Sequence, residues 1–184
     1  MGITFLDSWD IIIHALSAGL KDWGSLHPIV VHMPIALLLF APLFIVLGIL
    51  FQKCAKKFYL SALILLLAGT ASIYLAVSTG EVASELIERP KADVVVTLEA
   101  HDHLAQKSRL NYSILTSIFL TYMLLYLYLE KKFKAQTHHI FLILFLVIYA
   151  INLVLLFNTA HQGGKLVHHH GITSKLYVDK DQKK

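Results

Sequence analysis

The sequence predicts an all-α integral membrane protein: a four-helix bundle preceded by an N-terminal amphipathic helix at the membrane interface. Hydrophobic residues make up 57% of the 184-residue chain, whereas apolar residues make up about 45–50% of a soluble domain. Four apolar stretches each contain about 20 residues, the length that a helix needs to cross about 30 Å of hydrocarbon. Before the first stretch, apolar and polar residues separate onto two helical faces. Together these three observations predict the fold class.

The N-terminal segment, residues 1–25, has the pattern of a helix that lies in the interface. Its apolar residues recur at spacings of three and four, and its polar residues recur likewise on another face. The apolar positions are Leu6, Trp9, Ile13, Leu16 and Leu20. Tryptophan is enriched at the head-group level, so Trp9 and Trp23 are expected to anchor this segment there.

The membrane domain is predicted to cover residues 26–172, followed by a polar tail at residues 173–184. The four predicted spans are Ile29–Phe51, Tyr59–Val77, Leu110–Leu129 and Ile140–Ala160. These spans use most of the chain, so no soluble catalytic domain fits in the remainder. No nucleic-acid-binding module is recognisable, and the basic loops suit anionic lipid head groups. The single cysteine excludes an intrachain disulfide and the attachment motif of c-type haem.

Charge predicts the orientation in the membrane. Residues 53–57 and residues 131–134 each contain three lysines in a short loop. The positive-inside rule places both loops in the cytoplasm. Both termini are then periplasmic in a bacterial inner membrane. The beginnings of the first and third spans and the ends of the second and fourth spans meet at the outer face.

Histidines gather at this outer face. The histidines expected there are His27, His32, His101, His103, His161 and His168 to His170. An ionisable side chain at the edge of lipid is costly and therefore indicates function. Pro34, inside the first span, is expected to kink the helix or free a backbone carbonyl. We interpret His138 and His139, alone on the inner side, as ordinary loop histidines.

Converging imidazoles predict a bound metal or haem, because neutral imidazole is a good ligand for iron, copper and zinc. A b-type haem needs only a pocket and axial ligands, which two helices of a bundle can supply. The second span has a face of small residues with room for a flat ring: Gly69, Ser72 and Ala76. Gly163 and Gly164 would let the backbone approach a cofactor closely. The candidate ligands are His32, His101 and His161, followed by His27 and His170.

Two alternatives to haem remain open. One is a non-haem site for copper, zinc or iron with His32, His101 and His161 as ligands. The other is a scaffold subunit of a respiratory complex without a cofactor of its own.

Four motifs recur in a known family. They are His27-Pro28-x-x-Val31-His32-x-Pro34-Ile35-Ala36, Thr79-Gly80, His101-x-x-Leu104-Ala105 and His161-x-Gly163-Gly164-x-Leu166-Val167-x-x-His170-Gly171. Over residues 27–172 the chain resembles domain-of-unknown-function family 2231 (DUF2231), small four-span bacterial membrane proteins. Members more often have tyrosine at position 168, so the resemblance favours His170 within the histidine run. Some relatives are joined to periplasmic cytochrome-like domains, which implies redox work at the outer face.

The predicted function is membrane electron transfer through one or two b-type haems near the periplasmic face. The protein would link a quinol, or a partner subunit, to a periplasmic cytochrome or another carrier. The sequence leaves open which imidazoles face one another.

Overall fold

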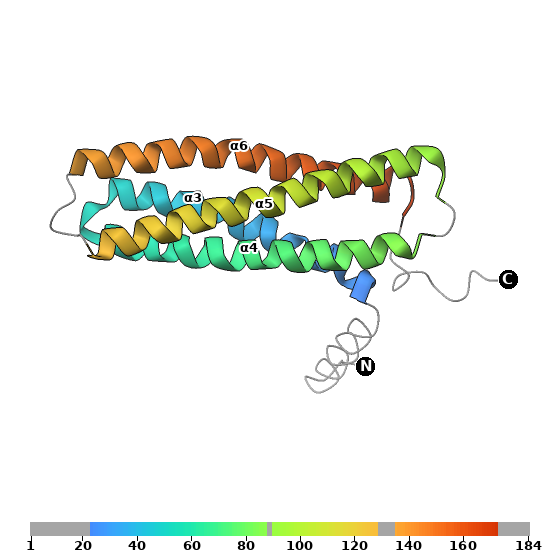
Figure 1. Ribbon diagram of the computed structural model, residues 1–184, viewed down its shortest axis with the longest axis horizontal. Coiled ribbons are helices and arrows are strands. Elements are labelled where there is room, and N and C mark those ends of the chain that lie inside the picture. Colours follow the sequence, from blue (N-terminus) through green and yellow to red (C-terminus); the bar gives the residue numbers. More distant parts are fainter. Residues whose placement is uncertain (1–22, 88–89, 129–134, 173–184) are drawn as a thin grey trace, which may run out of the picture.

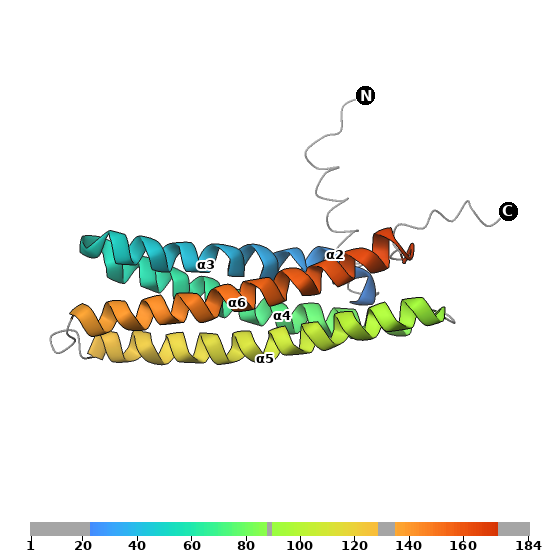
Figure 2. The same cartoon turned by 90° about the horizontal axis from the view of Figure 1, so that it is seen from above.

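The computed structural model describes residues 23–87, 90–128 and 135–172, and the regular structure in these ranges is helical. The elements are η1 (Trp23–Leu26), α2 (His27–Val30), α3 (His32–Leu50), η2 (Gln52–Cys54), α4 (Ala55–Glu85), α5 (Ala92–Tyr128) and α6 (Ala135–His168). The long helices α3 to α6 run along one another as a bundle (Figures 1 and 2). Residues 1–22, which contain most of the predicted interfacial helix, lie outside the described residues. The predicted polar tail, residues 173–184, also lies outside them.

Four helical segments are long and apolar enough to cross a membrane. They are Trp23–Leu50, Gln52–Glu85, Ala92–Tyr128 and His138–His168. This confirms the all-α, four-span class. Helix α5 has 37 residues, so at about 1.5 Å per residue it is longer than the roughly 30 Å hydrocarbon core. Its polar first half is therefore long enough to extend beyond the hydrocarbon. The end of the bundle where α5 begins contains a cavity, which is described below, and we call it the cavity end. We call the opposite end, which contains η2, the loop end.

The first span passes from α2 to α3 at Val31, where the backbone keeps helical dihedral angles. Pro34 has no N–H to donate, and its ring crowds the carbonyl of Val30. Pro34 lies in the first turn of α3, where a missing N–H costs little. His27 lies on the short helix α2, which packs on α4.

The helices pair as two hairpins, α3 with α4 and α5 with α6, and α4 joins them by packing on α5. Lipid tails are as apolar as the helix surfaces, so interhelical hydrogen bonds and close packing hold such a bundle together. Two pairs of polar side chains supply hydrogen bonds between helices. The hydroxyls of Thr70 and Thr116 are 2.7 Å apart, and Asn111 donates its amide to Asn152 at 2.9 Å.

At the loop end, the interpretation of His138 as a loop histidine is wrong. His138 belongs to α6 and is buried, with 6% of its surface exposed. Its ring nitrogens lie within hydrogen-bond distance of the hydroxyls of Tyr122 and Tyr59, which come from α5 and α4. His138 therefore ties three helices together at this end.

Candidate cofactor site

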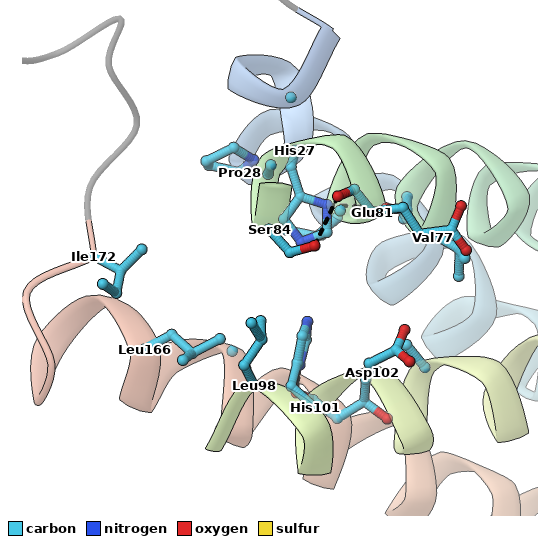
Figure 3. A pocket seen from close by; sticks show the side chains of 18 of the residues that line it. His27, Pro28, Val77, Glu81, Ser84, Leu98, His101, Asp102, Leu166 and Ile172 are labelled. Atoms are coloured by element: carbon cyan, nitrogen blue, oxygen red, sulfur yellow. Dashed lines mark hydrogen bonds between the residues drawn. The ribbon is translucent and has the colours of Figure 1, made fainter. Parts of the chain in front are cut away.

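The cavity end encloses a cavity of about 710 Å³ between the two hairpins (Figure 3). Its apolar walls include Val31, Ile35, Ile73, Leu98 and Leu166. Its ionisable lining residues are His27, Glu81, Glu85, His101 and Asp102. An apolar concave space of about 300–1,000 Å³ with a few convergent polar groups is the usual form of a small-molecule site.

His27 enters the cavity from α2 and is held by the end of α4. Its Nδ1 lies 2.9 Å from the carbonyl oxygen of Ala76 and 3.2 Å from Oγ1 of Thr79. A carbonyl only accepts, so Nδ1 carries the proton and Nε2 keeps its lone pair. The ring lies flush against Gly80, where a Cβ would approach Cε1 of His27 to 2.9 Å.

His101 repeats this arrangement in the second hairpin. Its Nδ1 donates to the carbonyl of Thr159 at 2.9 Å, so its Nε2 also keeps a lone pair. The ring lies against Gly163, where a Cβ would be 3.0 Å from Cε1. In both hairpins the accepting carbonyl lies four residues before the glycine, one helical turn away. The same local device therefore positions both imidazoles.

The two imidazoles approach each other from opposite walls. Their ring centroids are 6.2 Å apart and their planes are inclined by 80°. Figure 3 shows a ring nitrogen of His101 directed across the cavity toward His27. A metal–imidazole bond is about 2.0–2.1 Å long and a ring nitrogen lies about 1.1 Å from its centroid, so one shared metal ion separates opposed centroids by about 6.3 Å. The observed separation matches that value.

The remaining predicted histidines lie elsewhere. His32 is exposed and its Nδ1 donates to the Pro28 carbonyl at 2.7 Å, one helical turn earlier in the same span. His161 is exposed on α6 and does not line the cavity. Within the described ranges, no group of three or more histidine, cysteine or acidic side chains could hold a metal ion. The structure therefore brings His101 close to His27. It does not bring His101 close to His32 or His161.

The predicted small residues divide between packing and the cavity. A Cβ on Gly69 would collide with Leu38, so this glycine serves the close contact of α4 with α3. The buried Ser72 donates its hydroxyl to a carbonyl of its own helix. Ala76 and Gly163 line the cavity, whereas a Cβ on Gly164 would meet no atom within 4 Å.

An acidic wall lies beside the histidine pair, and sequence reasoning did not anticipate Glu81 as a part of it. Gln106 donates its amide to Glu81 at 3.2 Å and to Asp102 at 3.4 Å, which joins α4 to α5 beside the histidine pair. The described lining contains no lysine or arginine. Asp102 follows His101 directly in the chain, but only the packing of α4 on α5 brings Glu81 near Asp102.

The fold and the site define a class: a four-span membrane protein with a two-histidine cavity at one end of its bundle. The family model described as predicted membrane protein (DUF2231) matches residues 24–176, and the chain belongs to this family. This confirms the resemblance found in the motifs. No curated protein and no solved structure matches the chain.

Proposed function

We propose that this protein transfers electrons in a membrane and that His27 and His101 are the axial ligands of one b-type haem. The observation that supports this most strongly is the opposed pair of imidazoles with centroids 6.2 Å apart. Both rings donate Nδ1–H to a backbone carbonyl, which leaves Nε2 in the form that binds a metal. Bound haem would supply a one-electron iron couple.

The number of ligands favours haem over a bare metal ion. Structural zinc sites take four protein ligands and catalytic sites take three, but a haem iron needs only axial ligands from the protein. His27 and His101 supply two imidazoles, and no third candidate ligand joins them within the described residues. The cavity volume of about 710 Å³ suits a large flat ligand better than a single ion.

The acidic wall favours the second candidate, a non-haem copper, zinc or iron site. Glu81 and Asp102 give the cavity a negative side that attracts a cation. The carboxylates of a haem would have to face the aqueous mouth instead. A metal ion bound by His27, His101 and a shifted carboxylate is the arrangement that this candidate requires.

The electron partners follow from the placement in the membrane. The lysine-rich loops support a periplasmic cavity end in a bacterial inner membrane. A quinol in the lipid, or a partner subunit, would then donate electrons, and a periplasmic cytochrome would accept them.

The test is to purify the protein in detergent and record visible spectra of the oxidised and dithionite-reduced forms, with metal analysis. We expect a Soret band that sharpens on reduction together with a distinct α band. Substitution of His27 or His101 by alanine should abolish this spectrum. His32→Ala and His161→Ala serve as matched controls, since both histidines are exposed, and should keep it.

Two outcomes would overturn the haem proposal. A colourless protein with stoichiometric copper or zinc establishes the second candidate. A colourless, metal-free protein that is not loaded by added haem supports a scaffold subunit.

A further inference from the structure

We propose that a water molecule binds at the floor of the cavity, where it accepts a hydrogen bond from the hydroxyl of Tyr112 and donates one to the hydroxyl of Ser108. The proposal concerns a site beneath the histidine pair, and it stands whether the cavity holds a haem, a metal ion or neither.

The hydroxyl of Tyr112 is a buried polar group that needs a partner. Tyr112 belongs to α5 and is 0% exposed. Among the described residues, its hydroxyl is the buried side-chain group that has no hydrogen-bond partner. Burial of a hydroxyl without a hydrogen bond costs free energy, and buried polar side chains in proteins nearly always bind a protein group or an ordered water. The Tyr112 hydroxyl therefore points to a small bound ligand.

The neighbouring Tyr149 shows a tyrosine of the same core with its hydroxyl satisfied. It is also 0% exposed, and its ring centroid lies 5.7 Å from that of Tyr112. Its hydroxyl donates to the carbonyl of Leu38 at 2.7 Å. The two buried tyrosines thus differ in one respect: the Tyr149 hydroxyl has a carbonyl as its partner and the Tyr112 hydroxyl does not.

The unpartnered hydroxyl belongs to the helical turn directly below the cavity. Ser108 precedes Tyr112 by four residues, so the two share one face of α5. Ser108 lines the cavity, whereas Tyr112 lies outside the lining. A long side chain in a helix leans toward the N-terminus of that helix, and α5 begins at the cavity end. The Tyr112 side chain therefore leans toward Ser108, and the cavity gives water a route to the space between them.

Ser108 is able to accept a hydrogen bond from this water. The hydroxyl of Thr159 donates its hydrogen to the Leu155 carbonyl at 2.9 Å, so the contact of 3.2 Å between the Ser108 and Thr159 hydroxyls is a donation from Ser108. A hydroxyl oxygen has two lone pairs, so Oγ of Ser108 keeps its capacity to accept. A water between Tyr112 and Ser108 gains two polar partners, as many as an ordered buried water requires.

The water would place a hydrogen-bond donor in an otherwise apolar floor. Its second hydrogen is free to face the cavity, whose wall here includes Ile73 and Leu156. The row Tyr112, water, Ser108 and Thr159 ends at the residue whose carbonyl accepts from Nδ1 of His101 at 2.9 Å. A polar atom of an occupant that reaches the floor would bind this water or displace it.

The test looks for this water by infrared spectroscopy of the full chain in detergent. Spectra are recorded in ordinary water and in water labelled with heavy oxygen. The O–H stretch of an internal water lies apart from that of bulk water and moves to lower frequency with heavy oxygen, whereas the hydroxyls of the protein do not move. We expect the wild type to show such a band and Tyr112→Phe to lose it.

Two further variants sharpen the result. Tyr149→Phe is the matched control, because it removes a buried hydroxyl that has a carbonyl partner, and it should keep the band. Ser108→Ala removes the group that accepts from the water, so it should weaken the band or change its frequency. The alanine variant carries the test if Tyr112→Phe fails to fold.

A second measurement reads the Tyr112 hydroxyl itself. The phenolic C–O stretch of tyrosine depends on whether its hydroxyl donates a hydrogen bond, and the difference between wild type and Tyr112→Phe isolates this band. It should lie near the band that Tyr149→Phe isolates for a donating hydroxyl. A Tyr112 band at the position of a free hydroxyl would refute the proposal. So would internal-water bands that are the same in the wild type, Tyr112→Phe and Ser108→Ala.

Discussion

Gly163 and Gly164 are neighbours in the chain with different surroundings. Gly163 touches the ring of His101, whereas Gly164 has open space where a side chain would begin. The sequence predicts a close backbone approach at both. Only the rotation of α6 about its axis decides that Gly163 faces the histidine.

Gly163→Ala should weaken haem binding about tenfold or more, because its Cβ displaces the His101 ring and groups that orient a ligand affect affinity by about 10–100-fold. Gly164→Ala is the matched control and should bind as the wild type does. Spectroscopic titration of the apoprotein with haem measures both. Equal affinities for the two variants would show that the glycine does not position His101.

The acidic wall should lower the reduction potential of the proposed haem, because carboxylates near a haem iron stabilise its more positive oxidised state. Glu81→Gln and Asp102→Asn should each raise the midpoint potential, by on the order of tens of millivolts for one removed charge at a partly hydrated site. Potentiometric titration followed in the visible spectrum checks this. Glu99→Gln removes a charge outside the cavity lining and should leave the potential nearly unchanged.

At the scale of elements, the short helix α2 brings His27 to the site. Val31, between α2 and α3, keeps helical dihedral angles and donates its N–H to the His27 carbonyl at 3.1 Å. Helix α2 packs on α4, and His27 reaches the Ala76 carbonyl. The sequence predicts a disturbance at Pro34, but it does not show which histidine faces the cavity.

Pro34→Ala should weaken cofactor binding while stability stays level or rises. The new N–H can donate to the Val30 carbonyl and relieve the crowding by the proline ring, which should shift α2 and move His27 relative to α4. Pro42→Ala is the control, because Pro42 lies inside α3 and outside the cavity lining. It should stabilise the helix, by at most about 3 kcal/mol, without a change in binding. Thermal unfolding and haem titration together test the pair.

The Asn111–Asn152 bond should couple α5 to α6 by about 0.6 kcal/mol and at most about 1.7 kcal/mol, the range measured for hydrogen bonds between membrane helices. A double-mutant cycle of Asn111→Ala and Asn152→Ala, followed by unfolding in mixed detergent, measures this energy. Additive single effects would show that the bond contributes nothing net.

At the scale of the whole molecule, two hairpins enclose the cavity between them, and each supplies one imidazole held by the same carbonyl–glycine device. Neither hairpin forms the site alone. Cofactor binding should therefore stabilise the packing of one hairpin on the other, as any ligand stabilises the state that binds it.

The orientation of the protein in the membrane can be tested by labelling a single cysteine at either end of the bundle. The native Cys54 is exposed at the loop end, and the lysines around it predict a cytoplasmic position. In cells with a permeabilised outer membrane, an impermeant thiol reagent should spare Cys54 and label the Cys54→Ser, Val96→Cys variant. The reverse pattern would place the cavity end in the cytoplasm.

The sequence by itself determined the four spans, the helical class and the family, because span length and hydropathy are local properties that lipid enforces on each segment separately. It also determined that histidines gather at one end, since alternating spans bring those helix ends together. Only the tertiary structure decided that His27 faces His101 and that His32 and His161 stay outside. That choice depends on how each helix is rotated against its neighbours, and no single segment of the chain contains this information.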